Sequence, residues 1–271
     1  MGNVNFPFSR EFLTSSKYQQ LVERTFVGDH NYGTPDRQVG IHLAGDLADD
    51  TVAWNVSVTK AAVDPDNKKL DFDTAASLNA GDDWSEGEMI GGRIEFFPMG
   101  PYDYKQGDMK GDTKLAVAVA GFTWDNDSDN LVTNRAADSK NDVDSVTGVE
   151  VSAAFRSSGL SVDAAYNSFD ADLVDDGVTS GLYVDSSTTL ENWAVEGGYM
   201  IVPSKMELVA GYQVQDADGY AKEWTRKSLG MNWFIAKHDA KYQLTYRQGE
   251  NKDGKDGNDL DEIFLQAQYV F

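Results

Sequence analysis

The chain has no cysteine among its 271 residues, which excludes disulfide bonds, thiolate metal sites and cysteine nucleophiles. It has no uninterrupted apolar run of about eighteen residues, so no membrane-spanning helix is expected. Basic residues are scarce, since 23 Lys plus Arg face 45 Asp plus Glu and leave a net charge of −22. Such an acidic chain repels phosphate backbones, which excludes general nucleic-acid binding. Hydrophobic residues at 41% are nevertheless too many for a disordered acidic chain.

What the sequence does contain is a two-residue alternation of apolar and polar side chains. In residues 51–59 the even positions are Val52, Trp54, Val56 and Val58, which predicts a β-strand with one apolar face. The same pattern predicts further strands at 38–47, 88–97, 114–124, 146–156, 160–167, 191–202, 206–215, 224–235, 240–247 and 263–271, with a partial strand at 2–8. Strands of about ten residues match what a tilted strand needs to cross a bilayer.

Connections between the predicted strands alternate between short and long. The short ones are 48–50, 157–159, 203–205 and 236–239, with 98–113 as a longer exception, and the long ones are 11–37, 61–87, 125–145, 170–190, 216–222 and 249–260. The long connections carry 28 of the 45 acids and 10 basic residues. One rim of the predicted sheet is therefore strongly anionic, as expected for a barrel with short periplasmic turns and long external loops.

The chain ends on Phe271, preceded at every second position by Tyr269, Ala267, Leu265 and Ile263. A final strand that ends in an aromatic residue is typical of outer-membrane barrels. We therefore predict an all-β fold, a transmembrane up-and-down antiparallel β-barrel of about twelve strands, eleven of them complete. The alternative is a secreted acidic β-sandwich that binds glycans, in which the apolar faces pack against one another. The start of the sequence has neither a basic nor an apolar leader, so an exported protein is expected here as a mature form or a fragment.

Several segments are similar to a known family. Residues 6–16 read FPFSREFLTSS and are followed by LVER at 21–24, while 37–46, 91–98 and the ending from Leu229 continue the similarity. Over most of its length the chain resembles the phosphate-selective porins of the O and P type. The resemblance implies a bacterial outer-membrane barrel, usually a homotrimer, through which small hydrophilic solutes diffuse.

Two departures from this family affect the prediction. Members usually have about sixteen strands, so residues 1–271 are expected to form a single porin-like β-barrel domain that is either the C-terminal portion of a longer barrel or a shortened one that closes by itself. Phosphate-specific members line their constriction with cations, whereas the polar strand positions here carry six acids and five permanent cations. We expect no strong phosphate binding and at most a weak cation preference.

These polar strand positions are the predicted pore-lining residues. They are His42, Asp46, Arg93, Glu95, Glu150, Arg156, Asp163, Glu196, Glu207, Arg226, Lys241 and Arg247. In a conducting barrel, opposed rings of such charges filter solutes by size and charge. In a barrel that does not conduct, the same charges neutralise one another and fill the interior.

Acidic loops supply the candidate metal ligands. Asp125, Asp127 and Asp129 resemble the first ligands of a calcium loop, but Asn130 replaces the required Gly and Ala136 replaces the bidentate Glu. We therefore predict no cofactor beyond loosely bound Ca²⁺ at these loops. Three distant histidines, His30, His42 and His238, form no ligand spacing, and no nucleophile or nucleotide motif is present. The chain is accordingly expected not to be an enzyme.

The predicted function is passive diffusion of ions and small hydrophilic solutes through a porin in the bacterial outer membrane. The expected partners are membrane lipid, lipopolysaccharide and two further copies of the chain in a homotrimer. The alternative within the membrane is a structural or surface-binding barrel that does not conduct.

Overall fold

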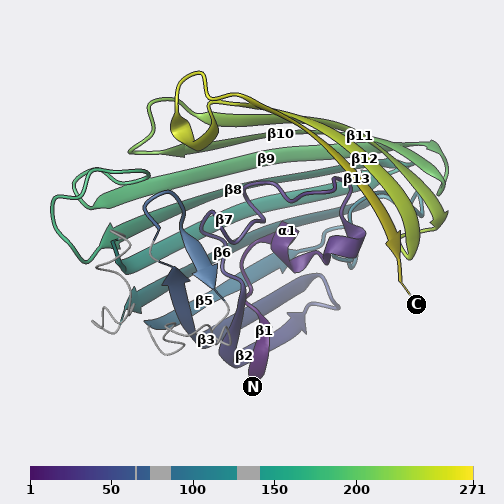
Figure 1. Cartoon of the computed structure of the whole chain (residues 1–271). Helices are drawn as coiled ribbons and strands as arrows, with labels where there is room; N and C mark the ends of the chain where they lie inside the picture. The colour runs from purple at the N-terminus through teal and green to yellow at the C-terminus, as the bar shows by residue number, and fades with distance from the viewer. Residues whose placement is uncertain (65, 74–86, 127–140, 271) are drawn as a thin grey trace.

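A computed structural model describes residues 1–64, 66–73, 87–126 and 141–270, and it shows a strongly curved antiparallel β-sheet (Figure 1). The strands are β1 Gly2–Asn5, β2 Arg37–Leu47, β3 Val52–Asp64, β4 Asp71–Asp73, β5 Gly87–Phe96, β6 Lys114–Asn126, β7 Val143–Ser157, β8 Leu160–Leu173, β9 Ser187–Val202, β10 Met206–Ala217, β11 Trp224–Ala236, β12 Ala240–Glu250 and β13 Leu260–Tyr269. Short helical turns are α1 at Arg10–Leu13, η1 at Ser16–Tyr18 and η2 at Lys252–Gly254. In the described ranges no helix has the length and apolar character needed to cross a membrane.

Each long strand pairs with its neighbours in the chain. The order β1-β2-β3-β5-β6-β7-β8-β9-β10-β11-β12-β13 is an up-and-down meander, and β4 pairs only with β3. Eleven complete strands and the short β1 lie on this path, which confirms the predicted fold class and strand number. Within the described residues β1 and β13 do not pair with each other, so the wall is curled but not closed. A twelve-strand barrel that closes by itself is therefore not what the structure shows.

Tight turns join the strands at one rim of the sheet, and longer connections lie at the other (Figure 1). The turn between β7 and β8 consists of Ser158 and Gly159, whose φ angles of 53° and 89° are both positive. Two left-handed residues in succession match the twist of the flanking strands, which makes such turns the favoured two-residue hairpin connection. The predicted division into a short-turn rim and a long-loop rim is confirmed.

The outer face of the sheet is apolar and exposed. On β13 the side chains of Ile263 and Leu265 are 76% and 80% exposed. Exposed large apolar residues continue around the sheet, and include Ile41, Leu43, Val56, Val58, Ile90, Ile94, Val119, Val149, Val151, Val195, Leu208, Leu229, Trp233 and Leu244. No β-sandwich leaves its apolar faces uncovered in this way, so the alternative of a soluble sandwich is wrong. An apolar outer face and a polar inner face define a sheet that meets lipid.

This polarity reverses where the strands approach the long-loop rim. On β8 the outward positions become Ser168, Asp170 and Asp172, while the inward ones become Phe169 and Ala171. Similarly, Thr123 and Asp125 face outward on β6. Above this level β6 and β8 resemble the strands of a water-soluble protein, with apolar side chains inward.

The apolar interior above the reversal is one packed cluster. Its members come from strands β3 to β10, from residues 6–8 and from the long connections, and include Phe6, Phe8, Phe72, Phe122, Trp124, Phe169, Leu182 and Tyr183. Phe122 lies edge-on to Phe6, Phe8 and Phe72, with ring centroids 5.1–5.9 Å apart. This cluster closes part of the long-loop mouth.

Candidate functional site

The interior of the sheet is occupied by residues 6–36, called here the N-terminal segment. It leaves β1 at the long-loop rim, runs along the concave side of the sheet and returns to β2 (Figure 1). Phe6 and Phe8 anchor its start in the apolar cluster, and Ser9 caps α1 by accepting a hydrogen bond from the backbone N–H of Phe12 at 3.3 Å. Whether residues 11–37 enter the lumen could not be decided from the sequence, and the structure shows that they do.

Inward side chains of distant strands bind the backbone of this segment. The Asn167 amide donates to the Val27 carbonyl at 3.2 Å and the Asn192 amide to the Tyr32 carbonyl at 3.0 Å. In turn, the Gln213 side-chain oxygen accepts from the Phe26 backbone N–H at 2.9 Å. A buried irregular segment must have partners for its backbone polar groups. The amide side chains of the inner wall serve this purpose.

A buried ion cluster fixes the segment against β5 and β7. Arg10 pairs with Glu95, and Arg93 pairs with Glu150 at 2.5 Å and with Glu95 at 3.4 Å. The guanidinium of Arg93 also donates to the Phe8 carbonyl at 2.6 Å. Arg93, Glu95 and Glu150 are at most 2% exposed. These predicted pore-lining residues therefore lie inside the sheet as expected, but they face protein and not open water.

The ion cluster extends to two residues at its sides. Asp163 on β8 lies 3.7 Å from the Arg10 guanidinium, and the Tyr104 hydroxyl donates to Glu95 at 2.5 Å. Burial raises the pKa of Tyr104 to about 12, so this hydroxyl keeps its proton and remains a donor at neutral pH. Two arginines thus face three carboxylates, Glu95, Glu150 and Asp163.

A second polar cluster holds the middle of the segment against β10, β11 and β12. Glu207 accepts hydrogen bonds from the side-chain amides of Gln20 at 2.6 Å and Asn232 at 2.9 Å. The Lys241 ammonium donates to the Gln19 carbonyl at 2.9 Å. Two further predicted residues, Glu207 and Lys241, are thereby engaged with the segment.

Further inward charges lie on β2, β11 and β12, while Glu196 on β9 and Arg156 on β7 line the two cavities described below. Arg226 stacks over the rings of Phe26 and Trp224 at 4.1 Å and 4.3 Å. The Nε and Nη2 atoms of Arg247 each lie 2.8 Å from the Oε2 atom of Glu262. On β2, near the edge of the sheet, His42 lies 2.8 Å from the Ser57 hydroxyl, and Asp46 is exposed.

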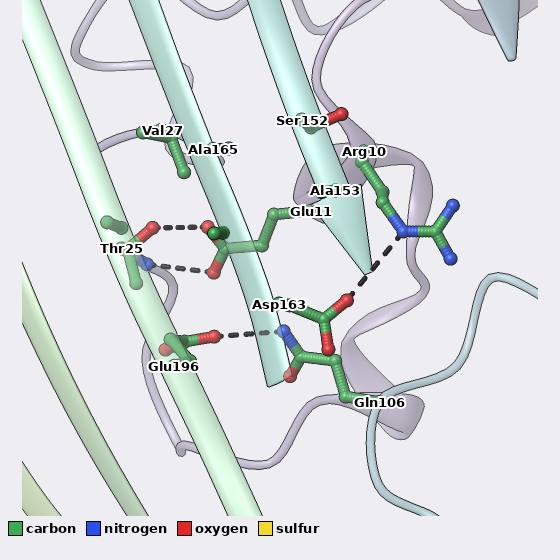
Figure 2. Close-up of a pocket in the computed structure, with 12 residues that line it drawn as sticks. Arg10, Glu11, Thr25, Val27, Gln106, Ser152, Ala153, Asp163, Ala165 and Glu196 are labelled. Atoms are coloured by element: carbon green, nitrogen blue, oxygen red, sulfur yellow. Dashed lines mark hydrogen bonds and ion pairs between the residues drawn. The ribbon is translucent and has the colours of Figure 1, made fainter. Parts of the chain in front are cut away.

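A small cavity of about 20 Å³ lies between the segment and strands β8 and β9 (Figure 2). Figure 2 shows Arg10, Glu11, Thr25, Asp163 and Glu196 around it. This volume accommodates about one water molecule. Glu11 accepts hydrogen bonds from the backbone and hydroxyl of Thr25, and burial raises the pKa of Glu11 to about 7. The carboxyl of Glu11 is therefore partly protonated at neutral pH.

A larger cavity of about 430 Å³ opens at the short-turn rim. Its walls are the β5–β6 connection with Tyr102 and Lys105, the end of β7 with Arg156, and the β11–β12 turn with His238. Both cavities are lined by Gln106, whose amide donates to Glu196 at 2.9 Å. Gln106 is therefore the lining residue that the two cavities share.

The structure describes only one of the three predicted calcium ligands in the acidic loop that follows β6. Asp125 is exposed at the end of β6, while Asp127 and Asp129 lie outside the described residues. Among the residues that are described, no cluster of three or more acidic or histidine side chains is arranged to hold a metal ion. Ca²⁺ binding at this loop stays a prediction.

Sequence reasoning missed the residues that narrow the interior. Arg10, Glu11 and Gln20 belong to a segment with no strand alternation, and Tyr102 and Gln106 belong to the unusually long connection at the short-turn rim. The unusual length of the 98–113 connection was the one feature of the sequence that could have indicated residues inside the sheet. The aromatic cluster at the long-loop mouth gave no signal in the strand pattern, because its members come from both strands and loops.

Known proteins share the fold of this chain. No protein-family model matches it. An uncharacterized protein of Aquifex aeolicus (strain VF5) is 25% identical over an alignment of 294 residues, which includes all of this chain and 64% of that protein. The chain thus spans less than two thirds of the relative's length.

Similar solved structures indicate the class of protein to which this fold belongs. OmpT of Vibrio cholerae with loop L8 deleted superimposes on this chain with a TM-score of 0.54 at 15% sequence identity. The superposition covers 98% of this chain and 74% of the OmpT chain. OmpT of Vibrio cholerae expressed in the outer membrane gives a TM-score of 0.51 at 15% sequence identity, and the superposition covers 97% of this chain and 72% of the OmpT chain. Both are described as outer-membrane proteins. The chain therefore has the fold of bacterial outer-membrane β-barrels, and its apolar outer face agrees with the predicted location in that membrane. These comparisons support the barrel class but not the phosphate-selective porin family.

Proposed function

We propose that this chain forms the wall and the constriction of an outer-membrane porin that lets ions and small hydrophilic solutes diffuse passively. The observation that carries the proposal is the division of the sheet into an apolar outer face and an inner face that bears the charged and amide side chains. The charged and amide side chains give the interior the polar lining that an aqueous passage needs. The N-terminal segment and the 98–113 connection narrow this passage, because both lie within the curve of the sheet.

A structural or surface-binding barrel that does not conduct is the second candidate. It is favoured by the aromatic cluster at the long-loop mouth and by the buried ion pairs of Arg93, which join β5 and β7 across the interior. Under the porin proposal, solutes pass beside these groups, on the side of β2. There the inward residue His42 is only partly buried and Asp46 is exposed.

Recording from planar lipid bilayers separates the two candidates. The folded chain is expected to produce unitary current steps, and a salt gradient is expected to give a reversal potential of weak cation preference or none. Heat-dependent migration on a gel verifies that the inserted protein is folded. If folded protein inserts into the bilayer without current steps, it is the structural barrel and the porin proposal fails.

We further propose that the assembly is a homotrimer. A structural neighbour, in-vitro folded OmpT of Vibrio cholerae, is described in a trimer form, and it covers 99% of this chain with a TM-score of 0.50. Mass measurement in detergent tests this: a mass three times that of the folded chain supports the trimer, and a monomer contradicts it. The absence of enzymatic activity stays a prediction.

A further inference from the structure

The cavity at the short-turn rim has the size and the charge of a ligand site. Its volume of about 430 Å³ lies within the range of small-molecule sites in proteins. Five cationic side chains line it, namely Lys105, Lys110, Lys114, Lys237 and Arg156, against four carboxylates. In a chain of net charge −22, a cavity in which cations outnumber acids is a local exception.

Three of the four carboxylates already have partners. Asp108 accepts from the backbone N–H groups of Gly111 and Gly159 at 2.8 Å and 2.7 Å. Asp239 lies 3.7 Å from Lys17, and Asp103 lies 3.5 Å from Lys105. Asp108 and Lys114 both keep their charges, because their hydrogen bonds are to backbone groups. The cavity therefore holds five cations against four carboxylates, one of which pairs with Lys17 from outside the lining. The cavity therefore has an excess of positive charge that an anion would neutralise.

Arg156 supplies the specific donor group. Its guanidinium lies over the Tyr102 ring at 4.4 Å, which fixes its plane. Its Nε and Nη2 have no hydrogen-bond partner among the described residues, and neither has the hydroxyl of Tyr102, a side chain only 6% exposed. A buried donor without a partner is costly, and a guanidinium edge with two free N–H groups matches the two oxygens of a carboxylate.

Aromatic rings supply an apolar wall. Tyr18 of the N-terminal segment and His238 of the β11–β12 turn pack edge to face, with centroids 5.3 Å apart. Burial, together with the nearby cations Lys241 and Arg156, lowers the pKa of His238 to about 3. His238 is therefore a neutral ring at pH 7 and not a further cation. A bare inorganic ion would leave this wall and most of the volume unused.

We propose that this cavity binds a small organic carboxylate, with its carboxylate on Arg156 beside Tyr102 and its apolar body against Tyr18 and His238. The lysines at the rim attract the anion, and the paired acids keep the excess charge small enough to favour a singly charged ligand. The site goes beyond the proposed porin function, because binding at this rim can be measured whether or not the barrel conducts.

Isothermal titration calorimetry with the folded full chain in detergent tests the proposal, with benzoate as the probe. Benzoate is expected to bind saturably, while benzamide, its neutral counterpart of the same shape, and inorganic phosphate are expected to bind at least about 10-fold more weakly. Binding of benzamide as tight as that of benzoate, or tighter binding of phosphate, overturns the proposal. So does a lack of saturable benzoate binding.

Variants locate the binding site. Arg156→Gln is expected to weaken benzoate binding by about 10-fold to 100-fold, because a hydrogen bond to a charged group contributes that much. The matched control is Arg37→Gln, the same change at an exposed arginine of β2 near the opposite rim. Tyr102→Phe keeps the ring under the guanidinium and is expected to weaken binding by about 3-fold to 10-fold. Unchanged affinity in Arg156→Gln, or in Tyr102→Phe should the arginine variant not fold, contradicts the assignment.

Discussion

At the scale of single residues, the charges inside this barrel are explained by the chain segment that they hold. Arg93 contacts Glu95, Glu150 and the carbonyl of Phe8 at once. Removal of one partner from such a buried set leaves an uncompensated charge, which is strongly destabilising. The alternation of the strands predicted that Arg93, Glu95 and Glu150 face inward, but it contained no information about Arg10, their partner from the N-terminal segment.

Glu11 makes stability depend on pH. Its pKa is about 7 in the folded chain, raised mainly by burial from an ordinary value of 4.5. The folded state therefore binds a proton that the unfolded state releases, so stability falls as pH rises from 4.5 to about 7 and then stays level. Glu11→Gln keeps an acceptor for Thr25 and removes this titration.

The measurement is urea unfolding of the folded chain at pH 5.5 and pH 8. The wild-type chain is expected to lose about 2 kcal/mol of stability between these pH values, because the window covers only the upper part of the shift. The Glu11→Gln variant is expected to lose clearly less stability than the wild type between the same two pH values. The matched control Glu23→Gln changes a glutamate of the same segment that is not buried, and should follow the wild type. An equal loss in Glu11→Gln and the wild type would show that other groups cause the dependence.

At the scale of the elements, strands such as β6 and β8 have two parts. The lower part alternates with its apolar side chains outward, and the part near the long-loop rim alternates with them inward, as Phe169 and Asp170 show on β8. The sequence pattern predicted 160–167 for this strand, whereas β8 continues to Leu173. The prediction ended early because the alternation changes phase at the level where lipid gives way to water.

The change of the outer face from apolar to polar can be tested on β12. Leu244 and Gln248 both face outward on this strand, below and above the reversal. Leu244→Arg is expected to destabilise the barrel by about 2–4 kcal/mol, because an arginine on the lipid face is costly at the depth of the bilayer centre. Gln248→Arg is expected to cost no more than about 1 kcal/mol near the interface. Urea unfolding from lipid vesicles measures both, and equal effects would contradict a membrane boundary between them.

At the scale of the whole molecule, charge is distributed unevenly. The six long connections predicted from the sequence hold 28 of the 45 acids. The N-terminal segment enters the interior, and the described parts of the other five connections leave the sheet at one rim. Through the proposed pore, such a rim concentrates cations at its mouth. The effect depends on ionic strength, since the Debye length falls from about 10 Å at 0.1 M salt to about 3 Å at 1 M.

The preference for cations is therefore expected to weaken as salt rises. Reversal potentials in KCl gradients should give a K⁺ over Cl⁻ permeability ratio modestly above one near 0.1 M and close to one near 1 M. The triple variant Asp253→Asn, Asp256→Asn and Asp259→Asn, in the β12–β13 connection, should lower the ratio at low salt only. A ratio that is independent of salt would place selectivity in the buried interior instead of the rim.

The sequence by itself determined the wall of the barrel: an antiparallel sheet, its strand order, its apolar outer face and its two unequal rims. These follow from neighbours along the chain, because side chains alternate faces at every residue of a strand. Only the tertiary structure decided what fills the interior. The contacts of the N-terminal segment join residues far apart in sequence, such as Arg10 with Glu150 and Gln20 with Asn232. Local periodicity has no information about such pairs, which form only when the curved sheet brings its inner wall around the segment.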